Sequence, residues 1–141
     1  MGRDKAEIMQ HIRSKFESDL FAKHAGIELL TLSPGHAKAQ MKLHPYHLNG
    51  VGTVQGGAIF TLADFAFAVA ANAHGTVAVA VNVSITFMKA VTSGVLTAEA
   101  HEVALNPRLG TYTVEVKDEP GNLIAVFQGL AYRKNEPLIK P

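Results

Sequence analysis

One segment constrains this chain more than any other, because it is apolar on every side of the helix that it predicts. Within residues 58–71 only Thr61 and Asp64 are polar. Alanine, leucine and phenylalanine without an internal glycine or proline favour a helix. Gly56 and Gly57 open this helix, and Asn72 closes it. A helix that is apolar all round is expected to be buried all round.

Asp64 stands in the middle of this helix and needs a partner or a chemical role. An ionised carboxylate in an apolar interior costs several kcal/mol unless it is paired or hydrogen-bonded. Other interpretations stay open beside a catalytic one. A membrane span is disfavoured by Asp64, by Gln55 and by the lack of basic flanks. Asp64 can also belong to a core hydrogen-bond network without a chemical role. A catalytic triad is disfavoured, because the sequence has no Gly-x-Ser-x-Gly motif and no cysteine.

Length and charge bound the class of protein. A chain of 141 residues predicts a single domain over residues 1–141. The net charge of +1, with acidic and basic residues mixed, argues against a nucleic-acid partner. The polar N-terminus does not resemble a signal peptide, so we expect a cytoplasmic protein without a membrane partner.

Residues 4–23 predict an N-terminal helix, because Ile8, Ile12, Phe16 and Leu20 recur at every fourth position. Alternating apolar and polar residues, separated by glycine- and proline-containing turns, predict six strands. These strands span 27–32, 36–43, 77–89, 95–105, 111–117 and 123–133.

The order of elements predicts an α+β fold in which a long antiparallel sheet wraps around the central helix. One sheet cannot hide the whole helix, and a free edge strand as long as 77–89 promotes pairing with another chain. We therefore expect two copies to join their sheets. The tail 135–141 is expected to be loose.

His44 and His47 lie in a loop that also contains Pro45. Two histidines without further ligands nearby fall short of the usual three or four ligands of a metal site. We expect both side chains to be solvated and predict no metal site.

A family resemblance appears at His-Leu-Asn-Gly, residues 47–50, followed by Gly-Gly-Ala-Ile-Phe-Thr-Leu-Ala-Asp, residues 56–64, and a valine-rich strand. Over about residues 20–134 the chain resembles the hot-dog-fold acyl-CoA thioesterases of the phenylacetate-pathway (PaaI-like) type. The resemblance implies a hot-dog fold, a homodimer that assembles to a homotetramer, and hydrolysis of acyl-CoA thioesters. It implies no cofactor, since coenzyme A is part of the substrate, and no metal.

The same resemblance implies roles for single residues. Asp64 drives hydrolysis and the backbone N–H of Gly56 holds the thioester oxygen. Asn49 and a polar residue of the following strand, Asn82 or Ser84, help to place the reacting group or water.

The chain departs from the family at Gln55, where many relatives carry histidine. Glutamine can donate a hydrogen bond to a carbonyl oxygen but cannot change its protonation near neutral pH. A non-catalytic hot-dog protein that binds acyl-CoA as a sensor or carrier therefore stays an alternative. A hot-dog dehydratase needs an Asp/His pair, and no histidine stands beside the central helix in such a motif.

The spacing of these residues predicts an active site shared between two subunits. The first N–H groups of a helix lack partners, and Gly56 and Gly57 let a ligand approach them closely. Eight residues of helix separate Gly56 from Asp64 by about 12 Å, whereas reacting atoms must come within about 3 Å. Gly56 of one subunit should then meet Asp64 of its partner, with Asp64 as general base or as nucleophile.

Basic side chains are expected near the mouth of the site, because coenzyme A carries phosphates. Lys89, Arg108 and Arg133 are candidates, and Arg108 in its Asn-Pro-Arg-Leu-Gly turn is the best of them. The phenylalanines around the central helix suit an aryl or a medium-chain acyl group equally well, so the acyl group stays open.

Overall fold

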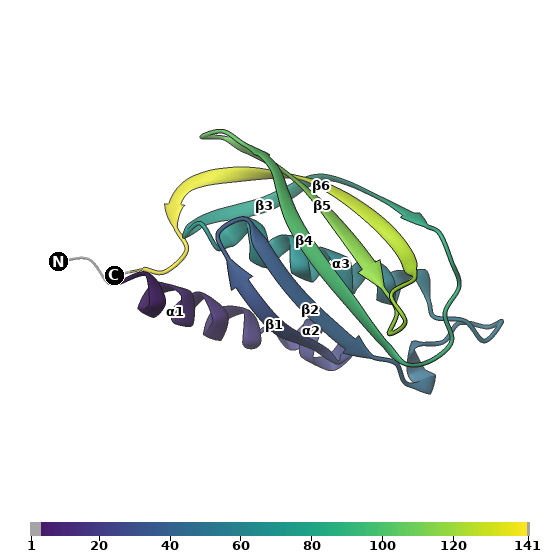
Figure 1. Cartoon of the computed structure of the whole chain (residues 1–141). Coiled ribbons are helices and arrows are strands. Elements are labelled where there is room, and N and C mark those ends of the chain that lie inside the picture. Colours follow the sequence, from purple (N-terminus) through teal and green to yellow (C-terminus); the bar gives the residue numbers. More distant parts are fainter. Residues whose placement is uncertain (1–3, 141) are drawn as a thin grey trace.

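The computed structural model describes residues 4–140, and in it a six-stranded sheet curls around one long helix (Figure 1). Its elements, in chain order, are α1 Lys5–Glu17, α2 Leu20–Ala25, β1 Ile27–Ser33, β2 His36–Lys42, the 3-10 turn η1 Pro45–His47, α3 Gly56–Asn72, β3 Thr76–Phe87, β4 Val95–Leu105, β5 Leu109–Lys117 and β6 Leu123–Pro137.

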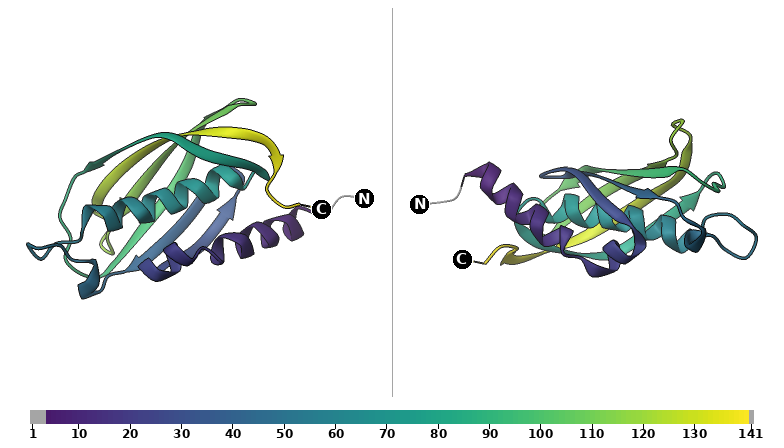
Figure 2. Two further views of the ribbon diagram at one scale, coloured as in Figure 1. Left: turned by 180° about the vertical axis from the view of Figure 1, so that it is seen from behind. Right: turned by 90° about the horizontal axis from the view of Figure 1, so that it is seen from below.

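All neighbouring strands are antiparallel, in the order β1-β2-β4-β5-β6-β3. Figure 2 shows α3 lying across the concave side of this sheet. Inward positions of β2 and β4 carry small side chains, such as the fully buried Ala37, Ala39, Ala98 and Ala100. These small residues let the helix approach the sheet closely. The predicted α+β fold, with an antiparallel sheet around the central helix, is confirmed.

The prediction of one N-terminal helix over residues 4–23 is wrong. α1 ends at Glu17, and α2 begins at Leu20 after a break at Ser18 and Asp19. The Asp19 carboxylate accepts a hydrogen bond from the Ala22 N–H at 3.0 Å, so it caps a new helix. Leu20, which the fourfold spacing placed on the apolar side, is 77% exposed.

The prediction of a loose tail from Asn135 is also wrong for most of that tail. β6 continues to Pro137, which pairs with Thr76 of β3. Leu138 is buried, and its N–H donates to the Gly75 carbonyl at 2.8 Å. Pro141 lies outside the described residues.

The two edges of the sheet differ in their cover. β1 lies against α1 and α2, and the Arg13 guanidinium donates to the carbonyls of Leu29 and Leu30 at 3.2 and 2.8 Å. At the other edge the buried Asn72 side chain holds the backbone of Ala78 at 2.9 and 3.1 Å. Beyond Ala78, β3 pairs within residues 4–140 with β6 alone. Apolar side chains are exposed there, including Val81.

Candidate active site

α3 is covered on the side that faces the sheet and partly open on the other side. Gly56, Gly57 and Ala58 are all partly or fully exposed in its first turn. Beyond that turn the partly exposed residues fall on one stripe of the helix: Phe60, Thr61, Asp64 and Ala68. The prediction that this helix is buried all round is therefore wrong for that stripe. A single sheet covers one side of a helix, and α2 covers only part of the other.

Asp64 opens into a cleft of about 230 Å³ between α2 and α3. The cleft is lined by Asp19, Phe21, Ala22, Phe60, Thr61, Asp64, Phe65 and Ala68. The break before α2 creates this wall, because the capping Asp19 lies in the break and the exposed Phe21 follows it. A second hollow of about 480 Å³, lined by the end of α1, by α2 and by β1, shares Asp19, Ala22 and Phe65 with the cleft.

The Asp64 carboxylate has no hydrogen bond or ion pair with any residue from 4 to 140, which argues against the core-network interpretation. Partial burial raises the pKa of Asp64, and the negative charge of Asp19 raises it further. A carboxylate that is partly desolvated and not bound to the protein is a stronger base than a solvated one. It is therefore suited to take a proton from water or to attack an electrophile.

The helix N-terminus provides the second chemical group. Gly56 is the first residue of α3, as predicted, and no side chain caps this end. The N–H groups of Ala58 and Ile59 donate to the Gln55 carbonyl at 2.9 and 3.3 Å. A Cβ built on Gly57 would meet nothing within 4 Å, whereas one on Gly56 would lie 3.1 Å from the Phe87 ring. The backbone at this end is thus open to a ligand beside Phe87.

Gln55 and Asn49 flank this helix start in different ways. Gln55 is exposed, and its backbone N–H donates to the His47 carbonyl at 2.8 Å. The Asn49 Oδ1 accepts from the N–H groups of Val51 and Thr53 at 2.9 and 3.2 Å, and its amide donates to the Thr53 hydroxyl at 3.0 Å. Asn49 therefore shapes the loop before α3, and its contact with substrate stays a prediction.

Asn82 and Ser84 do not join this site within one chain. Both are exposed on the face of the sheet that points away from α3, where they line a hollow of about 340 Å³ with Thr113 and Gln128. Val83 and Ile85 pack toward the core instead. The alternation of apolar and polar residues along the strand already predicts that Asn82 and Ser84 share a face opposite to that of Val83.

Lys89 and Arg108 lie at opposite ends of α3. Lys89 follows Phe87, whose ring lies against Gly56 at the start of the helix. Arg108 lines a hollow of about 680 Å³ together with Arg133 and with Thr76, which follows the end of the helix. Its guanidinium donates to the Tyr132 hydroxyl at 3.3 Å.

The expectation that both loop histidines are solvated is wrong for His47. His47 is buried, its Nδ1 accepts from the His44 N–H at 2.9 Å, and its Nε2 donates to the Ala25 carbonyl at 2.7 Å. With both ring nitrogens occupied, His47 joins the loop to the end of α2.

Known proteins resemble this chain along most of its length. The family model of the thioesterase superfamily matches residues 51–125. A putative esterase of Archaeoglobus fulgidus is 40% identical over 134 residues, covering 94% of this chain and 87% of that protein. The acyl-coenzyme A thioesterase PaaI of Escherichia coli is 34% identical over 125 residues, covering 88% and 89%. The solved structure of the E. coli PaaI protein has a TM-score of 0.89 at 31% identity, covering 94% and 97%.

Proposed function

This chain belongs to the thioesterase superfamily, and from that premise we propose that it hydrolyses acyl-coenzyme A thioesters to a free acid and coenzyme A. Its sheet around α3 is the hot-dog fold, and the protein is a thioesterase of the PaaI-like type. None of its helices within residues 4–140 is long and apolar enough to cross a membrane.

The observation that carries the proposal is the Asp64 carboxylate in its cleft. It lies on the open stripe of an otherwise covered helix, it has no bonding partner in the described chain, and its pKa is raised by burial and by Asp19. A group with these properties weakens the fold, so its presence is best explained by chemistry.

In the proposed reaction Asp64 takes a proton from water while the water oxygen bonds to the thioester carbonyl carbon. The carbonyl oxygen becomes an anion, which the Gly56 N–H stabilises at the positive end of α3. The C–S bond then breaks, and the coenzyme A thiolate takes the proton back from Asp64. In the nucleophilic variant the Asp64 carboxylate attacks the carbonyl carbon, and the C–S bond breaks to release the coenzyme A thiolate. Water then hydrolyses the resulting anhydride to the free acid and the Asp64 carboxylate, and the proton that this step releases neutralises the thiolate. Neither route consumes a cofactor.

The two groups act across a subunit interface in this proposal. Asp64 is eight residues from Gly56 in a regular helix, which separates them by about 12 Å. A single thioester cannot contact both groups of one chain. Gly56 of one subunit therefore serves Asp64 of its partner.

The exposed β3 edge supports such a dimer. Antiparallel pairing of two β3 strands about a twofold axis continues the sheet and covers the backbone beyond Ala78. It also brings the Thr76 end of one β3 beside the Phe87 end of the other. Arg108 of the partner subunit then approaches the helix start near Lys89, and both cations are available for coenzyme A phosphates. Assembly to a homotetramer and a cytoplasmic location stay predictions.

A subunit-mixing experiment tests the shared site. Asp64→Asn removes the base, and Gly56→Pro removes the N–H while proline suits the first position of a helix. The preceding Gln55 has φ −57° and ψ 131°, which a following proline accepts. Each variant alone should release little thiol from a panel of acyl-CoAs. A mixture refolded together should regain activity, because one site of each mixed dimer carries both intact groups.

Gly56→Ala is the matched control, since it adds the same Cβ beside Phe87 but keeps the N–H, and it should retain most activity. If the refolded mixture stays as inactive as its parts, the two groups do not act in trans. Tight acyl-CoA binding by the wild-type protein without thiol release would instead favour the sensor or carrier, which Gln55 keeps as the alternative function.

A further inference from the structure

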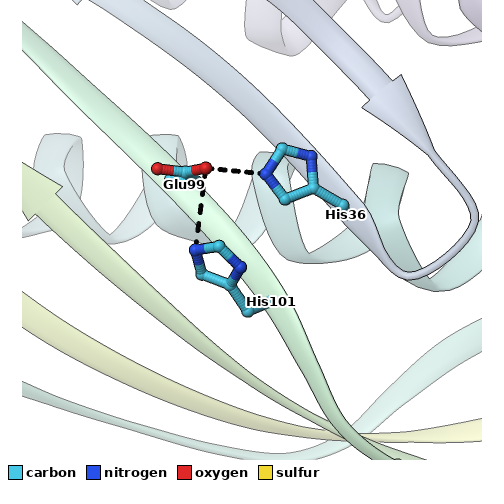
Figure 3. A group of neighbouring side chains, drawn as sticks. All are labelled: His36, Glu99 and His101. Atoms are coloured by element: carbon cyan, nitrogen blue, oxygen red, sulfur yellow. Dashed lines mark hydrogen bonds and ion pairs between the residues drawn. The ribbon is translucent and has the colours of Figure 1, made fainter.

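A separate cluster of titratable side chains lies on the face of the sheet that points away from α3. His36 projects from β2, and Glu99 and His101 project from β4, so that the three side chains converge (Figure 3). The His36 Nε2 lies 2.7 Å from the Glu99 Oε2, and the His101 Nε2 lies 3.6 Å from the same oxygen. The strand register pairs His36 directly with His101, with ring centroids 5.1 Å apart.

A hydrogen bond explains only part of this arrangement. The His36 ring is hydrogen-bonded to Glu99, but the contact from His101 is too long to be a hydrogen bond. Two imidazole nitrogens thus point at one carboxylate oxygen that binds only one of them. A cation placed among the three groups would engage both rings and the carboxylate at once.

The distances suit a small tetrahedral ion. All three ligand atoms lie within 4.8 Å of one another. Metal–ligand bonds of about 2.0–2.1 Å place tetrahedral ligands about 3.3 Å apart. The two histidine nitrogens lie 2.7 and 3.6 Å from the Glu99 Oε2, on either side of that value. The side chains are 32%, 39% and 56% exposed for His36, Glu99 and His101, so water can reach a fourth position.

The surrounding charges are balanced. Lys38 stands opposite Glu99 on β2, and Glu115 stands opposite it on β5. A glutamate carboxylate offers one or two oxygen ligands, and each imidazole offers one nitrogen ligand, which is the donor set of many zinc sites.

We propose that His36, Glu99 and His101 form a binding site for a divalent transition-metal ion, with Zn²⁺ as the best match to two imidazoles and one carboxylate. The ion connects β2 to β4 and stabilises the sheet, because it binds the folded chain and not the unfolded one. It plays no part in thioester hydrolysis, since Asp64 lies on the opposite side of the sheet.

Zinc titration of the full-length protein against a zinc-sensitive dye tests the site. The wild-type chain should bind one Zn²⁺ per subunit, and zinc should raise its unfolding temperature. His36→Gln, Glu99→Gln and His101→Gln should each weaken binding by at least about tenfold and remove the thermal shift. His24→Gln is the matched control, because His24 is an exposed histidine of α2 outside the cluster.

Two results would overturn the proposal. One is a wild-type protein without saturable zinc binding, and the other is equal zinc affinity in His101→Gln and His24→Gln. Folding of each variant is checked by its thiol release, which should match the wild-type rate, because none of these residues belongs to the hydrolytic site. Loss of the tetrahedral Co²⁺ absorption in His101→Gln, but not in His24→Gln, provides an independent readout.

Discussion

The two sides of α3 both carry small and aromatic residues, but they differ in their surroundings, and both polar residues of the segment 58–71, Thr61 and Asp64, lie on the open side. On the sheet side, Leu62, Ala63, Ala66, Val69 and Ala70 are completely buried. On the other side, small and aromatic residues of the same kinds remain partly exposed around Asp64 and the cleft. The difference teaches that a carboxylate is available for chemistry where the cover over a helix is incomplete, as it is around Asp64.

The comparison also separates stability from activity. Tight packing against the sheet stabilises the fold, whereas an unpaired carboxylate in a partly dry cleft weakens it. Substitutions on the sheet side should therefore mainly lower the free energy of unfolding, whereas substitutions around Asp64 should mainly lower activity. Three changes test this division, from the largest expected effect to the smallest.

Phe67→Ala should cost the most free energy of unfolding, about 3–5 kcal/mol. Phe67 is 2% exposed, and its ring meets those of Tyr112 and Phe127 at 5.5 Å. A Cβ on Gly129 would lie 2.8 Å from the Phe67 ring, so the ring fills all the space above that glycine. Urea unfolding measures the loss. Thr61→Ala on the open side, which removes only a hydrogen bond to the Gly57 carbonyl, should cost less than about 1 kcal/mol. Equal losses would mean that both sides are packed alike.

Asp64→Asn should lower turnover at least about a hundredfold, which corresponds to about 2.7 kcal/mol in the activation barrier. Its effect on stability should be neutral or favourable at neutral pH. Because the folded chain raises the pKa of Asp64, the ionised carboxylate destabilises the fold above that pKa, and asparagine removes this cost. The gain should disappear at acid pH, where the carboxyl is protonated in both states. Near-wild-type hydrolysis by the purified variant would exclude Asp64 from the mechanism.

Asp19→Asn should have the smallest effect and should move only the pH profile. Asparagine caps helices as well as aspartate does, so α2 should persist. Removal of the negative charge lowers the pKa of Asp64, and the acid limb of kcat/KM should shift to lower pH. Glu17→Gln, which removes a carboxylate that does not act on Asp64, should leave the limb in place. An unchanged limb in Asp19→Asn would show that Asp64 does not set it.

Most of the fold could be predicted because it rests on local patterns. β4 spans residues 95–105 as predicted, since alternation and two turns define it. The N-terminal break could not be predicted from spacing, because the apolar repeat continues through Leu20 while the capping signal at Asp19 is short. His47 was missed because its partners, Ala25 and His44, depend on how the loop folds back on α2.

The candidate site was predictable only where a residue differs in type from the residues around it. Asp64 and Gly56 stood out in this way, and Gly56 does begin the helix. Asp19 and Phe21 reach the cleft from an element far earlier in the chain, so no local pattern indicates them. The same limit applies to His36 and His101, which only the strand register brings together.

The short helix α2 has a consequence for how this enzyme can diversify. It forms one wall of the cleft, yet Ala22 is its one buried residue, and the neighbouring Leu20 and Phe21 extend into solvent. Replacing such side chains costs little folding free energy. Mutations in α2 can therefore change the shape of the cleft, and with it the range of substrates, while the packing of α3 against the sheet stays unchanged.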